Sequence, residues 1–221
     1  MRSRVWLSWS SGKDSAWALQ TLRADPEVEV AGLVCTLTRD FDRVSMHGVR
    51  RALVEAQARA AALALRFVEL PYPCPNERYE EAMRAFAEEV RRQGATHLAF
   101  GDLFLEDVRR YREALFAASG LGLLFPLWGR DTRALAEEAT AAGLRARIVC
   151  VDPRQAPGEW AGALYDAEFV RRIPPEVDAC AERGEFHTFA FAGPMFEREI
   201  ALRAGVVLER DGFVFADFLP A

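Results

Sequence analysis

Short apolar runs of strand length alternate with helix-patterned segments through the first two-thirds of this 221-residue chain. Strands are expected at residues 5–10, 28–37, 66–70, 97–101, 123–127 and 146–151, and helices at 15–23, 48–65, 76–93, 106–118 and 131–142. Such alternation is typical of βαβ units, which build a parallel sheet with helices on both faces. It therefore predicts a Rossmann-like α/β fold, in which ligands bind beyond the carboxyl ends of the strands.

The alternation stops at residue 152, where an irregular, proline-containing segment begins. Beyond it we expect a short helix at 163–172, a break at Pro174 and Pro175, an extended segment at 184–191 and a hairpin with strands at 206–209 and 213–218. Asp211 and Gly212 supply the hairpin turn, because Asp-Gly readily adopts the positive φ angles of tight turns. These features predict a larger domain over residues 1–152 and a small C-terminal α+β lobe over residues 153–221.

Composition limits the classes of protein to which the chain can belong. Hydrophobic residues make up 51% of it, which is enough for a sizeable core. No apolar run reaches the roughly 18 residues of a membrane span, and the first residues show no signal-peptide pattern, so we expect a cytoplasmic protein. The net charge of −5 argues against nucleic-acid binding.

The cysteines are scattered along the chain. Cys35, Cys74, Cys150 and Cys180 form no Cys-x-x-Cys pair, which argues against both a zinc site and a disulfide framework. Cys35 and Cys150 lie within apolar runs, so we expect them in the core.

One loop carries most of the functional information. Residues 10–15 (Ser-Ser-Gly-Lys-Asp-Ser) follow the first expected strand and open the first helix, and Lys13 is the only lysine in the chain. Gly12 permits a tight turn, the helix N-terminus favours an anion, and Lys13 with the three serines adds a positive charge and hydroxyl donors. Asp14 can cap the helix, hold Lys13 or contact Mg²⁺. The loop therefore predicts a phosphate-binding site.

Two common phosphate loops do not fit this segment. A Walker A loop needs glycine where Leu7 stands and serine or threonine where Asp14 stands, and the dinucleotide pattern Gly-x-Gly-x-x-Gly is missing. The segment instead resembles the PP-loop of the ATP pyrophosphatases, Ser-Gly-Gly-x-Asp-Ser, with Ser11 in place of the first glycine. This resemblance implies that ATP is cleaved to AMP and pyrophosphate.

Further polar groups are expected at the same edge of the sheet. His47 lies past the end of the second strand, in the segment Met46-His47-Gly48, where it can contact nucleotide or substrate. The alternative is a loop histidine that makes only a local hydrogen bond. Gly101 and Asp102 follow the fourth strand, where ligand-binding groups belong.

The helix after Asp102 carries several arginines and glutamates. At helical spacing part of this set must form solvated salt bridges. We expect either Arg109 or Arg112 to turn inward, because a guanidinium group can stabilise the negative charge that develops on leaving pyrophosphate.

The C-terminal lobe holds a second polar group of residues, Glu182, Gly184, Glu185, His187 and Thr188. In a strand, Glu185 and His187 project to one face, where the carboxylate can orient the imidazole as a general base. The alternative is an exposed polar face on a small sheet. With the phosphate loop present, we favour a role in binding the acceptor or moving its proton.

Taken together, these segments resemble the diphthine–ammonia ligase family, and in particular its bacterial-type members. The resemblance runs from Val5 to about Phe196 and rests on the order of residues 10–15, 46–48, 101–112, 126–132 and 184–188. It implies an adenine nucleotide alpha hydrolase-like domain with a C-terminal substrate lobe. It also implies that ATP and Mg²⁺ adenylate a carboxylate-bearing acceptor, either a small molecule or a modified protein side chain, which ammonia then amidates.

The site assignments that follow fall into three groups. Catalytic roles are predicted for Lys13, Asp102, Arg109, Glu185 and His187. Nucleotide contacts are predicted for Ser10, Ser11, Gly12, Lys13, Asp14, Ser15, His47, Gly101 and Arg112. Acceptor contacts are predicted for Glu182, Gly184, Glu185, His187 and Thr188.

Two other functions stay open from the sequence. One is a nucleotide-binding sensor without ligase activity, and the other is a PP-loop enzyme that modifies tRNA. The scattered cysteines and the acidic charge count against the second. The apolar segment at 213–220 leads us to expect that the chain can pair with a second copy.

Overall fold

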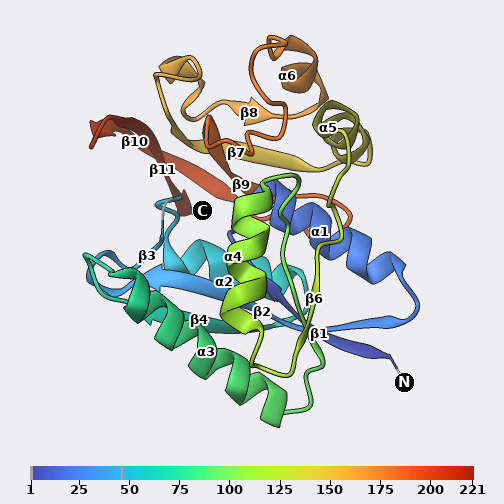
Figure 1. The fold of residues 1–221 in the computed structure, drawn as a ribbon. Helices are drawn as coiled ribbons and strands as arrows, with labels where there is room; N and C mark the ends of the chain where they lie inside the picture. Colours follow the sequence, from blue (N-terminus) through green and yellow to red (C-terminus); the bar gives the residue numbers. More distant parts are fainter. Residues whose placement is uncertain (1, 46) are drawn as a thin grey trace.

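The computed structural model describes residues 2–45 and 47–221 and contains two sheets (Figure 1). The strands of the first sheet are β1 (Ser3–Ser8), β2 (Val28–Thr38), β3 (Arg43–Val44), β4 (Ala64–Leu70), β5 (His97–Ala99) and β6 (Gly122–Leu124). Those of the second sheet are β7 (Arg145–Val151), β8 (Leu164–Tyr165), β9 (Phe186–Ala192), β10 (Leu202–Arg210) and β11 (Phe213–Pro220). The helices are α1 (Lys13–Ala24), α2 (Arg51–Ala60), α3 (Asn76–Arg92), α4 (Glu106–Phe116), α5 (Thr132–Ala141) and α6 (Ala167–Arg172), with short 3-10 turns η1 (Arg39–Phe41) and η2 (Gly158–Trp160).

The first sheet has the parallel topology that the alternation predicts. β1 pairs with β2 on one side and with β5 on the other, β2 pairs with β4, and β5 pairs with β6, all in parallel. Among the described strands of this sheet, only the two-residue β3 runs antiparallel to its neighbour β2. The winding direction of the chain changes between β1 and β5, and doubly wound sheets bind ligands at the carboxyl ends of the strands at such a switch. The loop after β1 lies at this point.

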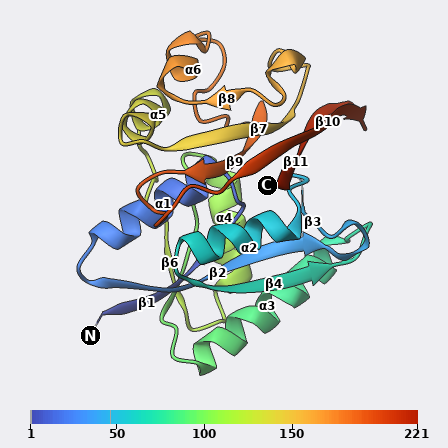
Figure 2. The same ribbon diagram turned by 180° about the vertical axis from the view of Figure 1, so that it is seen from behind.

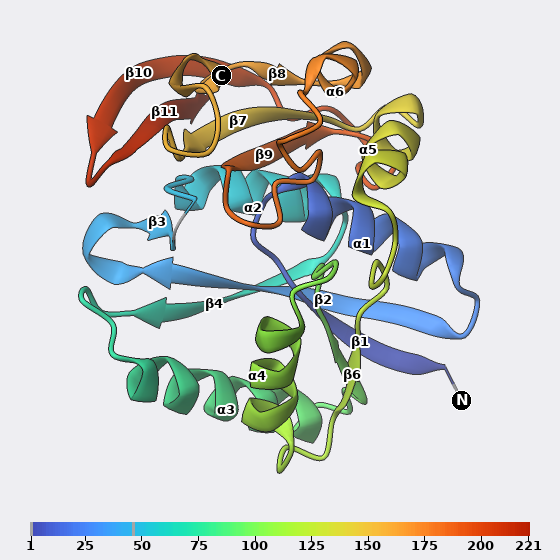
Figure 3. The ribbon, with the colours of Figure 1, turned by 45° about the horizontal axis from the view of Figure 1, so that its top comes forward.

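Helices cover both faces of the first sheet, as predicted. Figure 3 shows α1 and α2 between the two sheets and α3 and α4 on the opposite face of the first sheet. Seen from behind, α2 lies between β4 and the β10–β11 hairpin (Figure 2). A smaller apolar core lies under α3 and α4, where Trp6 packs edge-on against Phe86 with ring centroids 5.6 Å apart. The larger core runs without a break from the first sheet through α1 and α2 to Phe189 of the second sheet.

Residues 145–151 form a strand, but the prediction that this strand extends the parallel sheet was wrong. β7 pairs antiparallel with β8, β9 and β11 in the second sheet. The error has a physical cause, because the apolar run of a fully buried strand looks the same in either sheet. The predicted domain boundary at residue 152 cuts between β7 and its partners. As a statement about parts that fold separately, that boundary stays a prediction.

The C-terminal part contains the predicted hairpin. β10 and β11 are joined at Asp211 and Gly212, whose φ angles of 52° and 79° suit a tight turn. Cys35 and Cys150 are buried, as expected, and the four cysteines are free. Within the described part of the chain, no helix is long and apolar enough to cross a membrane.

Several helix boundaries differ from the expectation. The helix expected at 48–65 ends at Ala60, and β4 begins four residues later at Ala64. Pro75, not Asn76, takes the N-cap position of α3. The cap predicted for α5 is confirmed, because the Asp131 carboxylate accepts a 2.8 Å hydrogen bond from the N–H of Ala134.

Candidate nucleotide-binding site

The turn between β1 and α1 is tight and held by its own side chains. The Ser10 hydroxyl donates to Oγ of Ser15 at 3.2 Å, and the Ser15 hydroxyl donates to the carbonyl of Gly12 at 3.0 Å. A side chain at Gly12 would come within 3.2 Å of the carbonyl oxygen of Thr188. A larger residue at the N-cap of α1 would crowd β9, so glycine suits the close approach of β9 to the loop.

Ser11 adopts a left-handed backbone conformation, with φ at 71°. This conformation favours glycine, which accounts for the glycine of the PP-loop pattern at this position. The side chain is fully buried, and its hydroxyl has no hydrogen-bond partner within residues 2–45 and 47–221. Ser11 thus shapes the loop from inside, and the nucleotide contact predicted for it stays a prediction.

Gln57 on α2, which the sequence analysis did not single out, fastens the loop to β9. Its side-chain Nε2 donates to the carbonyls of Ser11 at 2.9 Å and Ala190 at 2.6 Å, and its Oε1 accepts from the indole N–H of Trp9 at 2.8 Å. The N–H of Ala190 also donates to the Ser11 carbonyl at 2.9 Å. A lone glutamine on the buried face of an Ala-rich helix was the available signal, because a fully buried amide needs partners.

Lys13 lies at the boundary of the two sheets and is almost completely buried. Its ammonium group donates to Asp14 at 2.9 Å and to the carbonyl of Cys180. It also lies 5.7 Å from the ring centroid of Tyr165 and 5.6 Å from that of Phe186, within cation–π range. Burial alone would lower the pKa of Lys13, but the adjacent Asp14 outweighs it and raises the pKa, so the lysine stays charged.

A cavity of about 220 Å³, here called the loop cavity, lies over these groups. It is lined by twelve of the residues predicted to be functional, namely Ser10, Gly12, Lys13, Asp14, Ser15, His47, Gly101, Asp102, Arg112, Glu182, His187 and Thr188. Segments next to both sheets contribute residues to the wall of the loop cavity. The backbone N–H of Lys13 donates to the Thr188 hydroxyl at 3.0 Å. The fold thus brings together segments that are far apart in the sequence. Met46 lies outside the described residues.

The two arginines considered on α4 have different environments. Arg112 turns toward the loop cavity and makes a bidentate ion pair with Asp102, at 2.5 and 3.0 Å. Arg109 pairs with Glu113 and lies over the rings of Phe125 and Trp128. Arg112 is therefore the inward-facing arginine. Arg109 is not among the described residues that line the loop cavity, and the catalytic role predicted for it stays a prediction.

Some of the residues predicted to bind the acceptor line the loop cavity, and others lie in the turn before β9. Glu182 lines the loop cavity, accepts from the N–H of Leu103 at 2.8 Å, and has a pKa that burial raises to about 7. Glu185 precedes β9 rather than lying on it, and its carboxylate accepts from the N–H groups of Asp178 and Arg183. Gly184 has φ at 88° in the same turn. Glu185 and Gly184 thus hold the shape of the turn, and the catalytic and acceptor-binding roles predicted for them stay predictions.

His187 packs against His47. The two ring centroids are 4.5 Å apart. Burial lowers the pKa of His47 to about 3 and that of His187 to about 4, so both rings are neutral near pH 7. A neutral imidazole can accept a proton, which suits His187 to a role as a base.

A second cavity, of about 460 Å³, adjoins the loop cavity and shares Ser8, Ser10, His47 and Arg112 with it. We call it the strand-end cavity, because Ser8, Thr36 and Leu70 lie at the carboxyl ends of β1, β2 and β4. Its wall includes Trp9 and Tyr79, which the sequence analysis missed. These residues looked like ordinary core and helix positions, so no local pattern marked them.

The fold and the site define a doubly wound α/β protein with a loop rich in serine and glycine at its switch point and a second sheet that completes the candidate site. Comparison with family models identifies the family. Residues 1–123 match the diphthamide synthase N-terminal domain, and residues 131–213 match the diphthamide synthase C-terminal domain. The chain belongs to this family, and membership implies a PP-loop ligase of the ATP-pyrophosphatase type. A comparison with curated protein sequences finds no significant match.

Proposed function

We propose that this protein is an ATP-dependent acid–ammonia ligase, which adenylates a carboxylate and then amidates it. The observation that carries the proposal is the convergence of Lys13, Arg112 and the N-terminus of α1 in one cavity that also contains His187. Positive charge and helix N–H groups suit a polyphosphate. The imidazole suits a step in which a proton moves.

Two adjoining cavities together offer space for the whole nucleotide. The strand-end cavity has the size and partly apolar lining expected for a nucleoside, with Trp9 and Tyr79 in its wall. The loop cavity would then take the phosphates, and the Ser10 and His47 side chains border both spaces. In this arrangement the reacting phosphate lies between the loop and β9.

The chemistry follows from these positions. A carboxylate oxygen of the acceptor attacks the α-phosphorus of ATP, the bond to the β-phosphate oxygen breaks, and pyrophosphate leaves with the electron pair. Lys13 and Arg112 would stabilise the charge on the leaving pyrophosphate. Ammonia then attacks the acyl carbon, AMP leaves, and the neutral imidazole of His187 can take up the proton that the nitrogen loses.

Magnesium is consistent with the same cavity. Among the described residues, no group of three or more His, Cys, Asp or Glu side chains could hold a metal ion alone. A Mg²⁺ ion on ATP needs only one or two carboxylates besides phosphate and water. Asp14 and Asp102 line the cavity and would supply them, and the ion would offset phosphate charge.

The test is phosphorus NMR of ATP incubated with the protein, Mg²⁺, ammonium and a panel of carboxylic acids. The proposal requires AMP and pyrophosphate in equal amounts, and Lys13→Ala should lower their formation by at least about 100-fold. Arg130→Ala, which removes only an exposed ion pair with Glu138, is the matched control. ADP and phosphate would overturn the proposal. Intact ATP with broadened signals would support the nucleotide sensor instead.

A further inference from the structure

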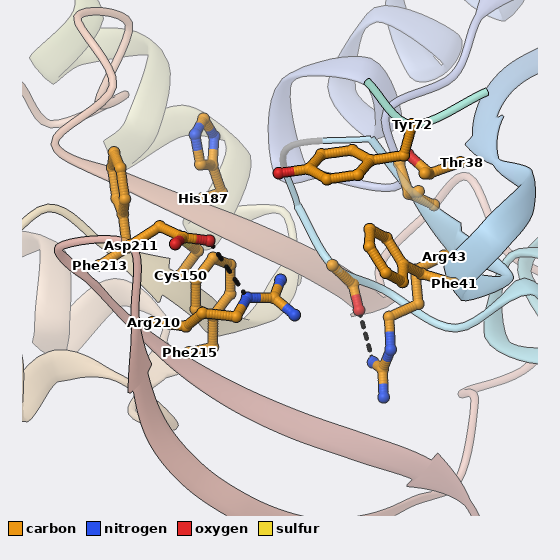
Figure 4. A pocket seen from close by; sticks show the side chains of 12 residues that line it. Thr38, Phe41, Arg43, Tyr72, Cys150, His187, Arg210, Asp211, Phe213 and Phe215 are labelled. Atoms are coloured by element: carbon orange, nitrogen blue, oxygen red, sulfur yellow. Dashed lines mark hydrogen bonds and ion pairs between the residues drawn. The ribbon is translucent and has the colours of Figure 1, made fainter. Parts of the chain in front are cut away.

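A third cavity, of about 400 Å³, lies beside the nucleotide site. Figure 4 shows Phe41 and Tyr72 on one side of it and Arg210, Phe213 and Phe215 on the other. The first side belongs to loops that follow β2 and β4, and the second belongs to the β10–β11 hairpin. We call this space the aromatic cavity. Its volume is that of a small-molecule site.

His187 connects the aromatic cavity with the loop cavity, because its side chain lines both. A molecule in the aromatic cavity can therefore have one end at His187, next to the space proposed for the phosphates. In the proposed reaction only one reactant needs such a position, namely the acceptor whose carboxylate attacks the α-phosphorus.

The walls of the aromatic cavity favour a flat apolar group. Phe41 and Tyr72 form a tilted pair with centroids 4.9 Å apart, yet their exposed fractions are 46% and 63%. Large aromatic side chains that remain so open at a cavity mouth are typical of a surface that a ligand covers. Phe213 and Phe215 form a second pair, at 6.4 Å.

The charges at the cavity favour an anion over a cation. Arg210 lies over the rings of Phe41 and Phe215, and its 3.6 Å ion pair with Asp211 is exposed on both sides, so it neutralises little of the arginine's charge. Arg43 lines the cavity too, and it shares one carboxylate, Asp217, with Arg50 outside the cavity. The charged residues that line the cavity are two arginines, Arg43 and Arg210, and one aspartate, Asp211, so the lining carries a net positive charge.

We propose that the aromatic cavity is the acceptor site and that the acceptor is a small carboxylic acid with a flat, apolar body. The body lies between the Phe41–Tyr72 and Phe213–Phe215 pairs, with the reacting carboxylate at His187. This inference rests on the proposed function for the reaction, but it makes a separate statement about binding. It disfavours an acceptor with a permanent positive charge, because the two arginines would repel it.

Binding can be tested without catalysis. Saturation-transfer NMR would measure the binding of phenylacetate, glutarate and 4-(trimethylammonio)benzoate to the 221-residue chain with bound nucleotide. We expect phenylacetate to bind at least 10-fold more tightly than the other two. Phe215→Ala and Arg210→Gln should each weaken phenylacetate binding by about 10-fold or more while ATP affinity stays within 2-fold. Val207→Ala, on the exposed face of β10, is the matched control.

The outcomes separate the two proposals. Stronger binding of the cationic acid, equal binding of all three, or no effect of Phe215→Ala would overturn the acceptor-site inference. If AMP and pyrophosphate form with some acid while Phe215→Ala leaves its KM unchanged, the ligase function stands and the acceptor lies elsewhere. Phenylacetate binding that Phe215→Ala abolishes, without any AMP formation from any acid, would support the ligand class and overturn the ligase function.

Discussion

The imidazole rings of His47 and His187 lie with their centroids 4.5 Å apart and their planes 46° apart, one from the loop before α2 and the other from β9. Burial is the main reason that both pKa values lie far below the ordinary 6.5. The contact is between two neutral rings, and it links the loop before α2 to β9 of the second sheet. Charging both would place like charges in a buried space, where their repulsion is poorly screened.

The stability of the protein should therefore fall as the pH falls below about 6.5. As the pH falls below about 6.5, the unfolded chain takes up a proton at each of the two histidines. The folded chain takes up these protons only near pH 4 to 3, because the pKa of His187 is about 4 and that of His47 about 3. Between pH 7.5 and pH 5 this difference costs up to about 2 kcal/mol per ring. Urea unfolding of His47→Gln/His187→Gln should show a correspondingly smaller loss, with His97→Gln as the control for removing a histidine elsewhere. An unchanged slope in the double variant would contradict the neutral pair.

Ser11→Gly should raise the free energy of unfolding by up to about 1 kcal/mol. The substitution relieves a left-handed backbone and removes a buried hydroxyl that lacks a partner among the described residues, and both gains exceed the added entropy of glycine in the unfolded chain. Ser11→Ala removes the hydroxyl but keeps the strain, so it separates the two effects. Denaturant titration measures both. A glycine variant less stable than the alanine variant would show that the backbone there is not strained.

Gln57→Leu should destabilise the fold by about 3 kcal/mol or more. It removes the Gln57 partner of the Ala190 carbonyl and of the Trp9 indole N–H, and it takes one of two donors from the Ser11 carbonyl. Gln57→Glu tests the direction of these bonds, because a carboxylate can accept from Trp9 but cannot donate to Ser11 or Ala190. We expect it to be at least as harmful at pH 7.5. Equilibrium unfolding followed by tryptophan fluorescence would measure both variants, and near-native stability in either would refute the role of this amide.

Arg112→Ala should lower the turnover of ATP by about 10- to 100-fold, because it removes the guanidinium group that faces the loop cavity. Arg109→Ala should keep turnover within about 3-fold, since that side chain pairs with Glu113 outside the cavity. Pyrophosphate release measured for the two variants side by side would decide between them. Equal losses would restore the catalytic role first predicted for Arg109.

Much of the site could be predicted because its chemistry is local. The loop from Ser10 to Ser15 combines a strand end, a helix start and the only lysine, and each of these signals is readable over a few residues. The parallel sheet was predictable for the same reason, since strand and helix periods alternate without a gap.

The rest depended on packing between distant segments. Trp9 and Tyr79 have no local signal that distinguishes them from core or surface positions, and their roles follow from what lies opposite them. Gln57 has one weak signal, an amide on the buried face of a helix, but its partners on β9 and in the loop cannot be read from nearby residues. β7 was assigned to the wrong sheet because a buried strand does not reveal its partners. Glu185 was read as a strand residue, but the strand begins one residue later and its carboxylate serves the turn.

The hydrogen bonds that join residues 11–13 to Ala190, Thr188 and Gln57 have a consequence for how the molecule unfolds. A phosphate loop whose backbone is completed by β9 cannot keep its shape once the second sheet melts. Unfolding of either sheet would remove hydrogen bonds that hold the other in place, so the chain should unfold as a single cooperative unit. We therefore expect one unfolding transition, and we expect bound nucleotide to shift the whole transition to higher temperature.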